Sequence, residues 1–109
     1  GMISENEFKK MKKKSYIINI ARGPIVNESY LIKYLKENKI AGAALDVFDQ
    51  EPLPKNNELF ELDNILLSPH ISGNFPNYNE LVMNIFKDNF YRFENKKPLK
   101  NRVCKKRLY

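Results

Sequence analysis

Four charged or titratable side chains stand beside short apolar runs, where they could do chemistry together. Arg22 and His70 each follow an apolar run, Asp46 lies inside another, and Glu51 lies in the loop after it. A guanidinium can donate two parallel hydrogen bonds to an anion. An imidazole can give or take a proton near neutral pH, and a carboxylate beside it favours the charged form. These side-chain types would therefore suit anion binding and proton transfer.

Taken singly, most of these residues also have an ordinary structural interpretation. Arg22 could be a surface arginine after a strand, His70 a structural imidazole, and Glu51 an exposed carboxylate in a proline-containing loop. Gly73 could be an ordinary turn glycine. Asp46 is different, because an acid within an otherwise apolar run needs a polar partner.

The elements that would position these side chains alternate between strands and helices. Residues 16–21 and 42–48 are apolar runs that predict strands buried on both faces. A helix over about 5–13 is indicated by Ser4 with Glu7 three residues later. A second helix begins after Asn27.

The second half of the chain continues the alternation. Two prolines among polar residues predict a loop over 49–57. Residues 65–68 predict a short strand, and Pro69 keeps Ser68 extended, which presents His70 at the strand end. Apolar residues at three- and four-residue steps predict a long amphipathic helix over about 76–94, packed on a core.

This order predicts an α/β fold with a parallel sheet covered by helices. Ligands of such sheets meet the carboxyl ends of the strands. Arg22, Asp46 and His70 all fall at those ends. Groups spread from residue 22 to residue 70 are therefore expected to converge on one edge of the sheet.

Three segments at this edge resemble the motifs of one enzyme family. They are Ile18-Asn19-Ile20-Ala21-Arg22-Gly23, Ala44-Leu45-Asp46-Val47-Phe48 with Glu51-Pro52, and Ser68-Pro69-His70-Ile71-Ser72-Gly73. In order and spacing they are similar to the N-x-A-R-G, L-D-V-F-x-x-E-P and P-H-x-x-G motifs of NAD(P)-dependent D-2-hydroxyacid dehydrogenases. Each motif is weak alone, but three in register identify the family.

The resemblance implies a role for each matching residue. Arg22 would bind the carboxylate and carbonyl of a 2-oxoacid, His70 would be its proton donor, and Glu51 would pair with His70 and keep the imidazole protonated to higher pH. Asp46 would bind the nicotinamide carboxamide. The same nicotinamide of NAD or NADP would be lined by Arg22, His70 and the backbone at Ile20, Ala21 and Gly73.

The chain also departs from the family pattern. The only glycines are Gly1, Gly23, Gly42 and Gly73, so the G-x-G-x-x-G turn that holds the pyrophosphate is absent. We therefore expect residues 2–94 to form the second half of a Rossmann-type, doubly wound NAD(P)-binding domain, and 95–109 a basic tail. The chain would be a fragment or truncated gene product, inactive alone.

Composition narrows the remaining possibilities. With 109 residues, 42% of them hydrophobic, the chain can build one core. The net charge of +6 lies mainly in lysine runs near 9–14 and 96–107, which we interpret as solvated surface and not as a nucleic-acid site. No apolar stretch could cross a membrane, and one cysteine with one histidine cannot form a structural zinc site, so no metal is expected. A cytoplasmic location follows.

The sequence therefore predicts part of an oxidoreductase that reduces a 2-oxoacid to a D-2-hydroxyacid with NAD(P)H. The alternative is a non-catalytic, NAD-sensing or protein-binding module of the same fold. A His-Glu pair favours the enzyme, because a binding module does not need one. A homo-oligomer is also expected, because the strand over 16–21 would leave a sheet edge open to pairing with another chain.

Overall fold

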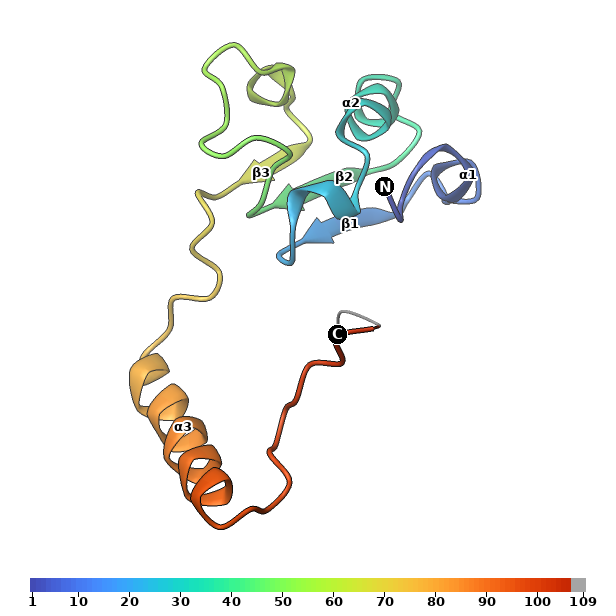
Figure 1. Ribbon diagram of the computed structural model, residues 1–109. Helices are drawn as coiled ribbons and strands as arrows, with labels where there is room; N and C mark the ends of the chain where they lie inside the picture. The colour runs from blue at the N-terminus through green and yellow to red at the C-terminus, as the bar shows by residue number, and fades with distance from the viewer. Residues whose placement is uncertain (107–109) are drawn as a thin grey trace. The chain divides into compact units, whose positions relative to one another are not determined.

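The computed structural model describes residues 1–106 (Figure 1). The end of the predicted basic tail, 107–109, lies outside the described residues. The chain forms two compact units, Gly1–Gly73 and Asn74–Tyr109. The first unit contains the sheet and the second the long helix.

Three parallel strands form the sheet, in the order β1 (Tyr16–Asn19), β2 (Gly42–Leu45) and β3 (Ile65–Leu67). The register pairs Asn19 with Leu45 and Leu45 with Leu67, so the three strands end level with one another. The predicted parallel sheet is confirmed, and so is the convergence of the strand ends on one edge.

Helices α1 (Glu5–Phe8) and α2 (Glu28–Lys36) lie on one side of this sheet (Figure 1). The Asn27 side chain caps α2 by accepting a hydrogen bond of 3.1 Å from the Tyr30 amide. α1 is shorter than the predicted helix over 5–13. Its capping interaction is present, but the chain turns by residue 15 to enter β1.

The two faces of the sheet are covered differently. On β1, Ile17 and Asn19 are buried beneath the helices, whereas Tyr16 and Ile18 are 70% and 71% exposed. Leu66 on β3 is also exposed. The prediction that 16–21 is buried on both faces is therefore wrong for the described chain, because α1 and α2 cover only one face.

A single core lies between the helices and the covered face. Its most deeply buried apolar side chains come from several elements: Phe8, Leu31, Leu35, Ile40, Val47 and Leu59. Leu59 belongs to a 3-10 helix over Glu58–Glu61, which the sequence did not predict. A second 3-10 turn, Gly23–Ile25, joins β1 to α2.

The second unit is built around α3 (Tyr78–Glu94), which confirms the predicted long helix. The chain after α3 folds back on it, where Lys100 and Asn89 exchange two hydrogen bonds and Lys100 pairs with Asp88. No α3 residue is buried in the described structure. The expected packing of this helix on a core stays a prediction. The first compact unit ends at Gly73. The predicted division into a nucleotide-binding part over 2–94 and a basic tail over 95–109 stays a prediction. Among the described helices, none has the length and apolarity to cross a membrane.

Candidate functional site at the carboxyl ends of the strands

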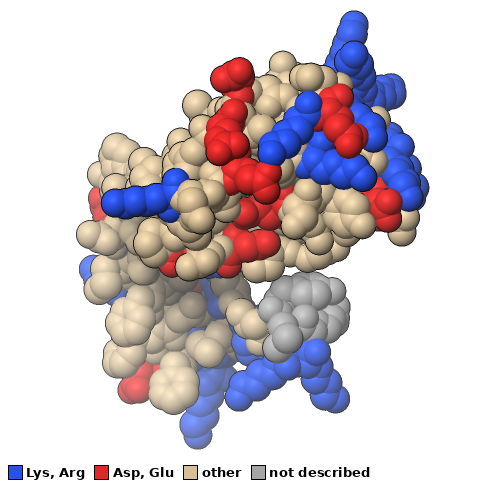
Figure 2. Space-filling view, turned by 90° about the horizontal axis from the view of Figure 1, so that it is seen from above, with Lys and Arg blue, Asp and Glu red and all other residues tan. Residues whose placement is uncertain are grey.

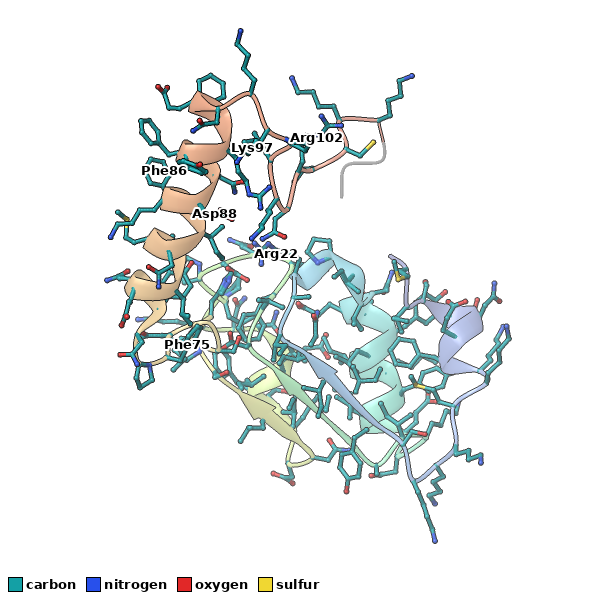
Figure 3. The ribbon with its side chains drawn as sticks, turned by 90° about the horizontal axis from the view of Figure 1, so that it is seen from below. Arg22, Phe75, Phe86, Asp88, Lys97 and Arg102 are labelled. Atoms are coloured by element: carbon teal, nitrogen blue, oxygen red, sulfur yellow. The ribbon has the colours of Figure 1, made fainter. Side chains whose placement is uncertain are left out.

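The turn that carries Arg22 is held by a buried amide. The Asn19 side chain donates to the Arg22 carbonyl oxygen at 2.9 Å and accepts from the Ala21 amide at 3.2 Å. The Arg22 side chain is exposed beyond the end of β1 (Figure 3), and its Nη1 donates to the Ala21 carbonyl oxygen. Asn19 therefore fixes the backbone while the guanidinium stays accessible.

Gly23 lets this turn lie against the loop that contains Glu51. A Cβ atom at Gly23 would stand 1.9 Å from the carbonyl oxygen of Phe48, a backbone atom that cannot move aside. The loop is also tied to α2, because Glu28 accepts hydrogen bonds from the Asn57 side chain at 2.8 Å and from the Asp49 amide at 3.4 Å. The loops after β1 and β2 therefore form one packed edge.

Glu51 and His70 meet at this edge. Nδ1 of His70 lies 2.7 Å from Oε2 of Glu51, and Oε1 of Glu51 accepts from the Phe48 amide at 3.0 Å. The hydrogen bond with His70, the bond from Phe48 and the charge of Arg22 lower the pKa of Glu51. Both side chains keep partial access to solvent, with 46% of His70 and 36% of Glu51 exposed. Glu51 is therefore an ionised partner for a reachable imidazole.

Asp46 directly follows β2 and is only 2% exposed. Its Oδ1 accepts from the Ser68 hydroxyl at 2.6 Å and from the Ile71 amide at 2.9 Å, and its Oδ2 accepts from the Ser72 amide at 2.8 Å. Burial alone would raise the pKa of Asp46, but these hydrogen bonds outweigh it and hold the pKa well below its usual range. The sequence argument that this acid needs partners is correct.

A hollow of about 510 Å³ opens beside the pair. Its lining is mostly apolar and comes from the ends of β2 and β3 and the loop between them: Phe48, Glu51, Pro52, Leu53, Phe60, Leu67, Ser68, Pro69 and His70. Within residues 1–106, no group of three or more His, Cys, Asp or Glu residues could hold a metal ion.

On the face shown in Figure 2, acidic side chains lie among the basic ones.

The structure brings together some of the predicted site residues and leaves others apart. Glu51 and His70 are in contact, and Arg22 acts on Glu51 through its charge. Ile20, Ala21 and Gly73 are exposed, and a Cβ at Gly73 would meet nothing within 4 Å. Their predicted contacts with nicotinamide stay predictions.

Sequence reasoning missed three residues that hold the site: Asn19, Glu28 and Ser68. Asn19 had a readable signal, because an amide in an apolar strand needs partners for the same reason as Asp46. Glu28 had none, since an acid in the first turn of a helix is common on any surface. Ser68 was assigned to the end of a strand, but its hydroxyl was not given a role.

The chain is similar to known proteins over most of its length. It matches the family model described as D-isomer specific 2-hydroxyacid dehydrogenase, NAD binding domain, over residues 1–72. It is 58% identical over 72 residues to the glyoxylate reductase of Thermofilum pendens, and 54% identical over 72 residues to that of Pyrococcus horikoshii. Both alignments cover 66% of this chain and 21% of the relative, so the chain spans a small part of their length.

The chain is also similar to solved structures of dehydrogenases. A D-isomer specific 2-hydroxyacid dehydrogenase from Xanthobacter autotrophicus Py2, in complex with NADPH and MES, matches with a TM-score of 0.91 at 34% identity; the match covers 100% of this chain and 44% of that one. The D-mandelate dehydrogenase of Rhodotorula graminis matches with a TM-score of 0.80 at 36% identity, over 91% of this chain and 29% of that one.

Proposed function

Because the chain belongs to the D-isomer specific 2-hydroxyacid dehydrogenase family, we propose that its residues serve the reduction of a 2-oxoacid to a D-2-hydroxyacid with NADH or NADPH. The observation that carries this proposal is the contact of 2.7 Å between His70 and Glu51 at the carboxyl ends of the strands. An imidazole that is hydrogen-bonded to a carboxylate at this edge is suited to proton transfer to a bound substrate.

The site residues fit the nicotinamide end of the cofactor. The Asp46 carboxylate is held at this edge by Ser68, Ile71 and Ser72, and the nicotinamide carboxamide would add an N–H donor to it. The backbone at Ile20, Ala21 and Gly73 would complete that contact. When bound, the cofactor supplies the hydride. The pyrophosphate end does not fit this chain, which has no glycine-rich turn to hold it.

His70 acts as the proton donor in this proposal. Glu51 holds Nδ1, which leaves Nε2 for the substrate. As the carbonyl carbon is reduced, the proton on Nε2 passes to the carbonyl oxygen, and the C=O group becomes C–OH. The neutral imidazole then takes a proton from solvent, to which His70 has access. In the oxidation direction the same nitrogen takes the proton back.

Arg22 binds the acid group of the substrate in the same proposal. Its guanidinium is exposed and can donate two parallel hydrogen bonds to a carboxylate. Among 2-oxoacids, glyoxylate is the first to test, because two of the similar proteins are glyoxylate reductases. The 109-residue chain alone is expected neither to bind NADPH tightly nor to turn over.

A chimera tests the proposal. The matching segment of the Thermofilum pendens glyoxylate reductase is replaced by residues 1–73, and NADPH oxidation is followed with glyoxylate and larger 2-oxoacids. The isolated chain is the negative control. Turnover that needs both nucleotide and 2-oxoacid supports the proposal. A folded chimera that binds NADPH but reduces no 2-oxoacid would contradict it and favour a non-catalytic, NAD-sensing module.

A further inference from the structure

Asp46 holds the chain on both sides of the proton donor. One of its oxygens accepts from the Ser68 hydroxyl and the Ile71 amide, and the other accepts from the Ser72 amide. These three donors bracket His70 in the sequence. No contact between Asp46 and the imidazole itself is needed to fix where the imidazole lies, because its backbone is anchored before and after it.

The anchoring matters because His70 has an uncommon backbone conformation. Its φ is +55°, in the left-handed region that residues with a side chain rarely adopt, and its amide donates to the Ser68 carbonyl oxygen at 3.1 Å. Such a conformation persists only where the surrounding structure imposes it. Asp46 supplies that constraint through Ser68, Ile71 and Ser72.

Asp46 can impose this constraint because it is itself fixed in the sheet. It directly follows β2, its amide donates to the Asn19 carbonyl oxygen at 3.0 Å, and its side chain is buried. The Asn19 side chain in turn holds the Arg22 turn. A continuous set of hydrogen bonds therefore joins the ends of all three strands.

We propose that Asp46 is the positioning residue of the His70–Glu51 pair: its carboxylate sets the backbone over 68–72 so that Nδ1 of His70 meets Glu51, whether or not a nucleotide is bound. This role is additional to the nicotinamide contact, which Asp46 would make only with bound cofactor. That this positioning serves catalysis rests on the proposed function. The positioning of His70 by Asp46 does not.

The test uses the 109-residue chain without nucleotide or substrate. The ¹³C resonance of the Glu51 carboxyl is followed against pH in the native chain, in Asp46→Asn and in His70→Ala. The groups that act on Glu51 are His70, the Phe48 amide and Arg22. Replacing His70 removes the first of these, so the pKa of Glu51 rises, and that rise calibrates complete loss of the pair.

In Asp46→Asn we expect the pKa of Glu51 to rise by most of the change that His70→Ala produces. An asparagine can accept through only one atom, and its amino group would face an amide donor. Ser68→Ala is the matched variant: it removes one hydrogen-bond donor to Asp46 and should give a smaller rise in the pKa of Glu51. If Asp46→Asn does not fold, Ser68→Ala carries the test.

An unchanged Glu51 titration in folded Asp46→Asn, or in Ser68→Ala where Asp46→Asn does not fold, would overturn the proposal. Because no step uses nucleotide or substrate, this outcome is separate from the fate of the proposed function. If the chimera is inactive, a rise in the pKa of Glu51 in Asp46→Asn still supports the positioning role of Asp46. If the chimera is active, an unchanged pKa of Glu51 still contradicts that role.

Discussion

Residues 1–73 and residues 74–106 are held together in different ways. The first region contains every buried apolar side chain of the described structure, and a hydrogen-bonded edge that carries the candidate site. In the second, α3 has no buried residue and is tied to the following segment by Asn89, Asp88 and Lys100. The family match ends at residue 72, at nearly the same point as the first region.

The two regions differ in the interactions that stabilise them. The first region gains its stability from apolar burial, which is strong and is not weakened by salt screening. The second gains it from exposed polar contacts, which are individually weak, although α3 carries apolar side chains such as Leu81, Phe86 and Phe90 at the surface. The site should therefore be sensitive to changes in the core of the first region.

The largest expected effect compares two leucines. Leu35 is 1% exposed and Leu81 is 51% exposed. Leu35→Ala should lower the free energy of unfolding by about 3 kcal/mol, because it removes a buried side chain and leaves a cavity. Leu81→Ala should change it by less than about 0.5 kcal/mol. Urea unfolding measures both, and equal losses would show that α3 is packed as firmly as the core.

Arg22→Lys sharpens the comparison within the first region. In the chimera it should lower kcat/KM for glyoxylate about 30-fold, because a lysine cannot donate two parallel hydrogen bonds to a carboxylate. Lys33→Arg on α2 is the control and should leave the rate unchanged. A rate for Arg22→Lys equal to that of the control would remove Arg22 from the substrate site.

The exposed face and edge of the sheet predict self-association. Tyr16, Ile18, Ile20 and Leu66 are all more than 60% exposed, and β1 is an edge strand. We expect the chain to form a dimer or higher oligomer through this strand or an exchanged α3. Ile18→Lys should weaken that association about tenfold, since it removes the burial of one apolar side chain. A monomer by light scattering at high micromolar concentration would contradict this expectation.

The smallest expected effect is a shift in pH dependence. Because the pKa of Glu51 is lowered, its carboxylate stays charged from the neutral range down to acid pH and can hold the ring of His70 through the 2.7 Å contact. As pH falls through the lowered pKa of Glu51, that charge is lost, so the acid side of the chimera's rate profile should show a falloff that Glu51→Gln lacks. An unchanged profile would mean that the pair does not act together in the enzyme.

The sequence predicted the strands and their common edge because the runs are mostly apolar and end at polar residues. The sequence overestimated the length of α1. A capping motif shows where a helix begins, but it does not show where the chain must leave the helix to enter β1. The 3-10 helix over 58–61 was missed, although Asn57, which accepts from the Leu59 amide at 2.9 Å, is an ordinary capping residue. The sequence could not show that one face of the sheet is exposed. Apolar residues occupy both faces of these strands, as they would in a strand buried on both faces.

For the candidate site, the motifs singled out Arg22, Asp46, Glu51 and His70 but did not show how these residues are held. The three donors to Asp46 come from a turn whose shape depends on the left-handed conformation of His70. Nothing in a Pro-His-Ile sequence predicts that conformation. Local geometry of this kind follows from tertiary contacts between strand ends, which residue spacing alone does not describe.

The most direct test of the central claim is chemical rescue of the proton donor. His70→Ala in the chimera should lower kcat for glyoxylate reduction by about 10²- to 10⁴-fold, and added imidazole should restore part of the rate by supplying the missing acid. The unmodified chimera should not respond to imidazole. If His70→Ala keeps a rate within a few-fold of the parent, or if imidazole accelerates both proteins equally, His70 is not the proton donor and residues 1–73 do not carry the catalytic step.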